Sequence, residues 1–148
     1  SRCWSNTDDS CFGDTSMSAK DFKLQLNAEY KAKSEEILEV FAHVQNDALI
    51  GLVMKAPVDT GRFRSNMSVS ISTPDLTTLP KTTIKGASQV ISEGQNKIYS
   101  NKRAVKVYIQ NNLPYAMRLE NGWSKQAPQG MIAITLNELE HKYDGMII

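Results

Sequence analysis

The stretch ILEVFAHVQNDALIGLVMKAPVDTGRFRSNMSVSIS, residues 37–72, decides the fold, because its periodicity changes from helical to strand-like across a proline. Apolar residues in its first half recur at steps of four, three, four and four, which predicts one stripe of an α-helix. They are Ile37, Phe41, Val44, Ala48 and Leu52. Pro57 ends the helix, because proline and the residue before it both disfavour helical backbone. The stretch therefore predicts a helix, a turn and a strand in that order.

The helical pattern extends back to Ala19, so we expect one helix from Ala19 to Lys55, with a break or second start at Ser34, a good capping residue. Residues 1–16 are rich in Ser, Asp, Thr and Asn and show no periodicity. We expect a flexible N-terminal extension there, a native start at Met17 and a single domain over residues 17–148. Both cysteines, Cys3 and Cys11, lie in the extension, where a bridge would stabilise nothing distant.

Two segments downstream have the period of two that is typical of half-buried strands, residues 65–73 and 104–110. Their expected inward residues are Met67, Val69 and Ile71 in the first strand and Val105, Val107 and Ile109 in the second. The segment between them, residues 73–99, is expected to hold a Thr-rich loop and a short helix that Gly94 weakens.

The C-terminal part is expected to be helical. A short helix over residues 114–121 would stop at Gly122, and a last helix would start at Pro128. The expected inward residues of the last helix are Ile132, Leu136, Leu139 and Tyr143. The fold class is therefore α+β, with a long N-terminal helix, a small antiparallel sheet with an inserted segment, and short C-terminal helices.

Composition excludes several classes of function. The 148 residues carry 17 basic and 16 acidic side chains, which is not the basic excess of a dedicated nucleic-acid binder. No apolar run approaches the roughly 20 residues of a membrane span, so we expect no membrane association. His43 and His141 belong to no cluster with metal-ligand spacing, and phosphate-cradling and nucleophile motifs are missing from the sequence. We expect no metal, no cofactor and no enzymatic activity.

The basic residues gather most densely at Lys97, Lys102, Arg103 and Lys106. Solvated loop positions are the default interpretation of such a cluster. A second hypothesis is contact with DNA or with an acidic partner, because phosphate contacts need only Lys or Arg nearby.

The segment PVDTGRFR, Pro57–Arg64, is the first candidate for function. As a helix-to-strand corner it has a simple explanation, in which Asp59 accepts a backbone hydrogen bond in an Asx-turn and Gly61 takes a positive φ. The catalytic alternative is an aspartic protease, because Asp59-Thr60-Gly61 matches the active-site triplet in which two Asp carboxylates share a proton. The flanks do not fit, because a long helix precedes the triplet and the bulky Arg62 follows it.

The segment LPYAMRLENGW, Leu113–Trp123, is the second candidate. By itself it predicts a short amphipathic helix with Tyr115 and Leu119 on one face and Trp123 as a partial core anchor.

In this order, the two segments resemble the siphophage neck and tail-completion family of head–tail connector and minor tail proteins. The pattern is a helix ending in P-V-D-T-G-x-hydrophobic-R, a strand, and a second strand leading to P-Y-A-x-x-x-E-x-G. The matching positions are Pro57, Val58, Asp59, Thr60, Gly61, Phe63, Arg64, Pro114, Tyr115, Ala116, Glu120, Gly122 and Trp123. The resemblance extends from Met17 to about Tyr143, and the run SKQAPQGMIAITLNE, residues 124–138, is similar to the close of one branch. The insert over residues 73–99 and the cysteine-containing N-terminus depart from the pattern.

The resemblance implies a bacteriophage virion protein without chemistry. Such proteins complete the tail end or join it to the head, as a ring of identical subunits, six in the usual geometry, around the DNA channel. The implied partners are further copies of the chain, tail terminator or tail tube proteins, and head-completion or portal proteins. The implied location is the neck of a virion that assembles in the host cytoplasm. A small adaptor or toxin-neutralising module is the other non-enzymatic alternative.

The candidate structural and interface residues come from both segments. They are Asp59, Thr60, Gly61, Arg62, Arg64, Tyr115, Glu120, Gly122 and Trp123. We further expect Arg62 or Arg64 to pair with Glu120, either within the fold or across subunits.

Overall fold

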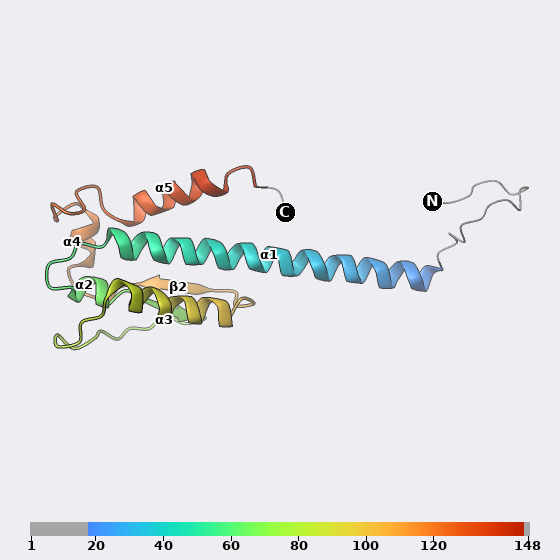
Figure 1. The fold of residues 1–148 in the computed structure, drawn as a ribbon, viewed down its shortest axis with the longest axis horizontal. Coiled ribbons are helices and arrows are strands. Elements are labelled where there is room, and N and C mark those ends of the chain that lie inside the picture. The colour runs from blue at the N-terminus through green and yellow to red at the C-terminus, as the bar shows by residue number, and fades with distance from the viewer. Residues whose placement is uncertain (1–17, 147–148) are drawn as a thin grey trace, which may run out of the picture. The chain divides into compact units, whose positions relative to one another are not determined.

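The computed structural model describes residues 18–146, and its longest element is helix α1, Ala19–Lys55 (Figure 1). The hydroxyl of Ser18 accepts a hydrogen bond from the backbone N–H of Asp21 at 3.1 Å, which caps the helix start. The break expected at Ser34 is wrong, because the Ser34 hydroxyl donates to the carbonyl of Tyr30 at 2.8 Å inside a continuous helix.

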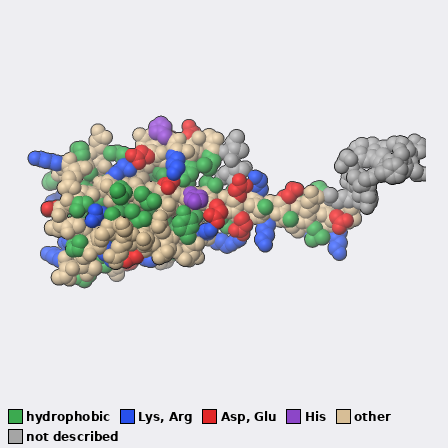
Figure 2. All heavy atoms as spheres, in the orientation of Figure 1, with side chains coloured by type: hydrophobic (Ala, Val, Ile, Leu, Met, Phe, Trp, Pro, Cys, Tyr) green, Lys and Arg blue, Asp and Glu red, His purple; other side chains and the backbone are tan. Residues whose placement is uncertain are grey.

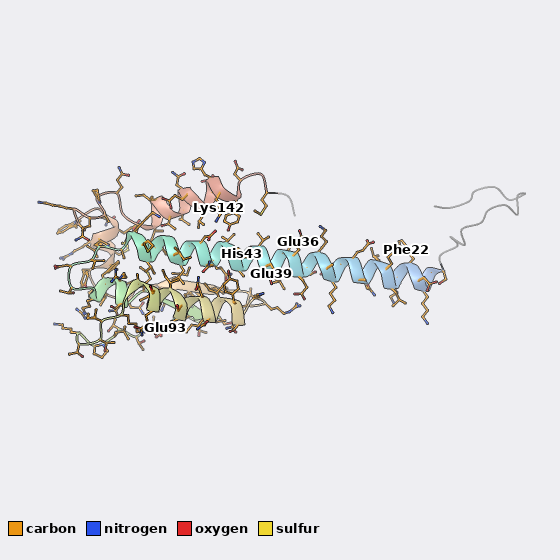
Figure 3. The ribbon with its side chains drawn as sticks, in the orientation of Figure 1. Phe22, Glu36, Glu39, His43, Glu93 and Lys142 are labelled. Atoms are coloured by element: carbon orange, nitrogen blue, oxygen red, sulfur yellow. The ribbon has the colours of Figure 1, made fainter. Side chains whose placement is uncertain are left out.

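The chain divides into two units, and the division falls within α1, between Glu36 and Ile37. The expected extension over residues 1–16, with its two cysteines, lies outside the described residues. In the first unit, residues 18–36 are exposed apart from a half-buried Ser34. Four large apolar side chains are among the exposed residues, and the figure with side chains shows the first of them standing out from the helix (Figure 3). These are Phe22, Leu24, Leu26 and Tyr30.

In the second unit, α1 is buried along Ala42, Leu49 and Val53. The predicted stripe is therefore wrong at its start, because Ile37 is largely exposed and Phe41 is 57% exposed. Apolar residues surround this half of the helix, so spacing alone did not identify the buried face.

The sheet has two antiparallel strands, β1 (Ser68–Ile71) and β2 (Val107–Gln110), with Val69 opposite Ile109. The inward positions predicted for β1 are confirmed, since Met67 and Val69 are buried. The prediction that Val105 faces inward is wrong, because this residue lies before β2 begins and is 95% exposed.

A short helix that the sequence did not predict, α2 (Arg62–Ser65), precedes β1. The insert contains the predicted loop and helix α3, Ala87–Ser100, with Val90 and Ile98 buried as expected. At Gly94, α3 packs closely against both α1 and β1. A Cβ atom there would overlap Leu49 Cδ2 and would lie 3.0 Å from Val69 Cγ2. The residue that weakens the helical pattern therefore allows the close packing of the core.

Two helices close the chain, α4 (Ala116–Glu120) and α5 (Ile132–Tyr143). The buried residue of α5 is Thr135, whereas the predicted inward residues Ile132 and Leu136 are 49% and 59% exposed. That part of the prediction is wrong, whereas the other two predicted residues, Leu139 and Tyr143, are half-buried, and the Tyr143 hydroxyl donates a hydrogen bond to Asp47 of α1. The α+β class with its long first helix, small antiparallel sheet and short final helices is confirmed.

Among the described residues, α1 is the one helix that is long and apolar enough to cross a membrane by length and composition. The sequence-based expectation that no segment approaches this criterion is therefore wrong. A mostly buried core helix meets the same criterion, but only 17% of the apolar window of α1 is buried inside the protein.

Candidate functional site

The corner after α1 is built by Thr60 and Gly61. Gly61 has a φ of 84°, which is the left-handed backbone expected for it and which other residues adopt only with strain. The Thr60 hydroxyl accepts a hydrogen bond from the backbone N–H of Arg62 at 3.3 Å. The Asx-turn predicted at Asp59 is wrong, because Thr60 supplies the side-chain acceptor and Asp59 is exposed.

Ser65 and Asn66 hold the other end of the corner. The Ser65 hydroxyl donates to the Gly61 carbonyl at 2.6 Å and accepts from the backbone N–H of Lys85 at 2.7 Å. The Asn66 side chain donates to the Arg62 carbonyl at 2.8 Å and accepts from the N–H of Leu79 at 2.8 Å. Both residues are buried, so these bonds fix α2 against the insert.

The second segment forms α4 and the loop that follows it. Gly122 has a φ of 87°, and a Cβ atom there would overlap the carbonyl oxygen of Pro128, so the predicted glycine stop is confirmed. Trp123 is 73% exposed, so its predicted role as a partial core anchor is wrong. The Arg118 guanidinium lies over the Trp123 ring, 5.3 Å from the centroid, as a cation–π pair.

The two segments meet in space although about fifty residues separate them in the sequence. They line a shared groove of about 350 Å³. The Phe63 and Tyr115 rings lie 6.2 Å apart between centroids, and Asn111 donates to the Phe63 carbonyl at 2.7 Å. The groove is lined from the first segment by Pro57, Asp59, Thr60, Gly61, Arg62 and Phe63, and from the second segment and its loop by Tyr115, Leu119, Trp123, Ser124 and Gln126.

Gln126, in the loop after the second segment, uses its side-chain amide to bind the backbone of Val58 in the first segment. Its side-chain oxygen accepts from the N–H of Val58 at 2.8 Å, and its side-chain nitrogen donates to the Val58 carbonyl at 3.1 Å. This pair imitates one rung of a β-ladder. Sequence reasoning missed Gln126 and Asn111 as site residues, because an amide side chain in a loop carries no periodicity that would reveal its partner.

Glu120 has a structural role that differs from the predicted one. Its carboxylate accepts hydrogen bonds from the backbone N–H groups of Met131, Ile132 and Ala133 at 2.8 to 3.2 Å, at the start of α5. Burial alone would raise the pKa of Glu120, but these three backbone hydrogen bonds outweigh it and hold the pKa below its usual range. Glu120 thus caps α5, where a negative charge is favourable.

The predicted pairing of Glu120 with Arg62 or Arg64 within the fold is wrong, because both carboxylate oxygens of Glu120 are directed to the α5 backbone. The Nε atoms of Arg62 and Arg64 are buried and have no hydrogen-bond partner. Pairing across subunits stays a prediction.

The groove offers one carboxylate, Asp59, and no second acidic side chain lines it. An aspartic protease dyad needs two carboxylates that share a proton, so it would require a second copy of the chain. Among residues 18–146, no group of three or more His, Cys, Asp or Glu side chains could hold a metal ion.

Two residues of the basic cluster over residues 97–106 are engaged in internal contacts. Lys97 donates to the Val69 carbonyl at 3.0 Å, and Lys102 forms an ion pair with Glu39 of α1. Contact of this cluster with DNA stays a prediction.

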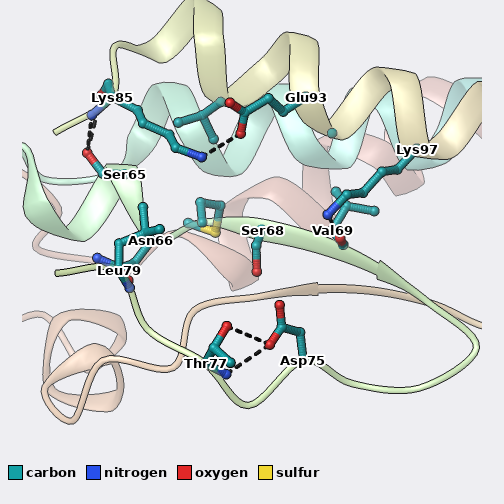
Figure 4. A pocket seen from close by; sticks show the side chains of 13 residues that line it. Ser65, Asn66, Ser68, Val69, Asp75, Thr77, Leu79, Lys85, Glu93 and Lys97 are labelled. Carbon is teal, nitrogen blue, oxygen red and sulfur yellow. Dashed lines mark hydrogen bonds and ion pairs between the residues drawn. The ribbon is translucent and has the colours of Figure 1, made fainter. Parts of the chain in front are cut away.

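A second, smaller cavity of about 150 Å³ lies between α3, β1 and the loop of the insert (Figure 4). Lys85 pairs with Glu93 at 2.6 Å, and Asp75 accepts from the hydroxyl and the N–H of Thr77 at 2.7 and 2.9 Å. Lys85 and Glu93 neutralise each other, and Asp75 is held by Thr77, so these charged groups of the cavity already have partners within the fold. The joint groove is the stronger candidate site.

No protein-family model, curated protein or solved structure matches this chain. The family resemblance therefore depends on the two segments and their order.

Proposed function

We propose that this chain is a non-enzymatic structural protein of a bacteriophage neck, which completes the tail end and joins head to tail as a ring of subunits around the DNA channel. One observation carries the proposal. The two segments on which the resemblance depends form a single groove, held by the Phe63–Tyr115 contact and by Gln126.

The chemistry of the groove rim supports a contact surface. Trp123 and Met117 are 73% and 70% exposed, and Arg118 lies against the Trp123 ring. Exposed tryptophan beside arginine is typical of the residues that dominate binding energy at protein interfaces. We propose that this rim, formed by Met117, Arg118 and Trp123, contacts a neighbouring ring of tail or head-completion proteins.

A second surface suits contact between copies of the chain. Phe22, Leu26 and Tyr30 are exposed on the first unit of α1, at helical spacing of four. An apolar helix face is normally buried against another element, so we propose that a neighbouring subunit covers it. Charged side chains of both signs are interspersed over the surface shown in Figure 2, consistent with assembly through such specific contacts.

The proposal is tested by complementation of a phage that lacks this gene. Without the protein, we expect separate heads and tails in negative-stain images. The Trp123→Ala variant should fail to restore joining, because it removes the aromatic centre of the rim. The matched control is Leu76→Ala, an exposed apolar side chain in the insert, which should restore joining. Joined virions in the absence of the protein would contradict the proposal.

The Asp59→Asn variant distinguishes the protease alternative from the proposed neck protein in the same assay. We expect normal joining and folding, because Asp59 is exposed and holds no hydrogen bond in the corner. Peptide cleavage at acidic pH that disappears in Asp59→Asn would establish the enzyme instead. A single soluble partner with no ring would favour the adaptor alternative.

A further inference from the structure

Helix α5 lies along α1 (Figure 1), and it contacts α1 where Thr135 comes close to Gly51 and through hydrogen bonds between charged side chains. Its buried residue is Thr135, and the Thr135 hydroxyl oxygen has no hydrogen-bond partner. A buried polar atom without a partner costs free energy, so the centre of this contact opposes docking. Ile132 and Leu136 are exposed, and the other aliphatic side chains of similar size in α5, Ile134 and Leu139, are only half-buried and lie outside the hydrophobic core.

Two cavities adjoin the contact. One of about 340 Å³ lies between α1 and α5, and another of about 560 Å³ lies between the end of α1 and the loop before α5. Met54 and Lys55 line both. Both cavities are open to solvent, so the side chains that line them make fewer apolar contacts than those of a closed interior.

Charged groups hold α5 in place instead. Lys55 pairs with Glu138 at 2.6 Å, and Asp47 accepts from Lys142 at 2.6 Å and from the Tyr143 hydroxyl at 2.5 Å. Figure 3 shows Lys142 on α5 beside α1. Each pair has one partner with a largely exposed side chain, so salt screens both attractions.

We propose that α5 is a releasable strap, which leaves α1 while the core of α1, α3 and the sheet stays folded. Local opening of this kind occurs where few apolar contacts are buried. Release uncovers the α1 face at Ile50 and Gly51, which are half-buried and border the groove beside α5. The inference is independent of the proposed neck function.

Hydrogen exchange of the full chain tests the strap. We expect the backbone amides of α5 to exchange at least about tenfold faster than those of α3, with a ratio that grows as sodium chloride is added. Exchange of α5 and α3 at one common rate at every salt concentration would overturn the proposal.

Charge variants sharpen this test without touching the core. Lys55→Gln and Lys142→Gln should each accelerate exchange in α5 alone. The matched control is Lys85→Gln, because Lys85 pairs with Glu93 of α3 at the same 2.6 Å with similar exposure. If Lys85→Gln accelerates α5 as much as the other two variants do, the charges do not hold a separate strap.

A covalent clamp provides the reverse experiment. A Cβ atom at Gly51 would lie 2.8 Å from Thr135 Cγ2, so cysteines at these two positions can form a disulfide. In a background with Cys3→Ser and Cys11→Ser, the oxidised Gly51→Cys, Thr135→Cys protein should exchange in α5 as slowly as in α3. Reduction should restore fast exchange, and fast exchange in the oxidised form would overturn the proposal.

Discussion

The two sides of α1 in the second unit hold their neighbours by different physical means. On one side, Leu49 and Val53 are completely or almost completely buried, and α3 and β1 approach closely at Gly94. On the other side, α5 is attached by ion pairs from Asp47 and Lys55 beside a groove that is open to solvent. The same helix therefore carries a packed core and a charged, loosely filled contact.

The comparison shows that a helix lying beside α1 need not add much to the free energy of unfolding. Apolar contact without voids scales with buried area and is insensitive to salt. Exposed ion pairs contribute little and weaken as salt is added. We therefore expect the two sides to respond differently to the same substitution.

The largest effect is expected from Leu49→Ala on the core side. Loss of a fully buried leucine should lower the free energy of unfolding by about 2–5 kcal/mol, because a cavity remains. Leu139→Ala on the half-buried side of α5 is the matched control and should cost about 1 kcal/mol or less. Urea denaturation followed by circular dichroism measures both, and equal losses would remove the distinction between the two sides.

A methyl group added at Gly94 should also destabilise the folded protein. Gly94→Ala ordinarily favours a helix by about 1 kcal/mol. Here the added atom overlaps Leu49 and crowds Val69, so we expect a net loss of about 1–3 kcal/mol. Thermal unfolding measures it, and a raised melting temperature would show that the core side is less tightly packed than the structure indicates.

Glu120→Gln tests the cap at the start of α5. The variant keeps an acceptor but loses the charge, so we expect a loss of about 1 kcal/mol at pH 7, discounted for partial exposure. The pKa of Glu120 is lowered in the fold. The stabilisation that its charge gives to the folded state is therefore complete above the ordinary glutamate pKa of about 4.3. It disappears as the pH falls through the lower pKa of the folded state.

The two proteins should therefore become equally stable in acid. Denaturation at pH 7 and at about pH 3 compares them, since that interval brackets the ordinary glutamate value. A difference that persists unchanged at the lower pH would assign the effect to hydrogen-bond geometry rather than to charge.

The smallest effect is expected from Gly51→Ala, which makes the same change as Gly94→Ala on the opposite side of α1. The new Cβ atom would lie 2.8 Å from Thr135 Cγ2, but α5 can move away from it. We expect the free energy of unfolding to stay within about 1 kcal/mol of the original, with the helix propensity of alanine offsetting the contact. A loss as large as that of Gly94→Ala would show that α5 belongs to the rigid core.

Local sequence signals predicted much of the fold and only part of the candidate site. The positive φ of Gly61 and of Gly122 could be predicted, because each follows from turn chemistry within a few residues. The partners of Glu120 and Gln126 could not, because their hydrogen bonds join segments that meet only after folding. The exposure of Trp123 was likewise decided by the loop that displays it, not by its apolar character.

The sequence by itself determined the order of the main elements and the bounds of the longest helix. Helix α1 runs from Ala19 to Lys55 as its pattern predicts, and β1 lies within the predicted strand. Only the tertiary structure decided which faces are buried. Around α1, apolar residues lie on several sides, and the buried face is the one at Ala42 and Leu49, where Gly94 of α3 packs against Leu49. Periodicity is a property of one element, whereas burial depends on the shape of its neighbours.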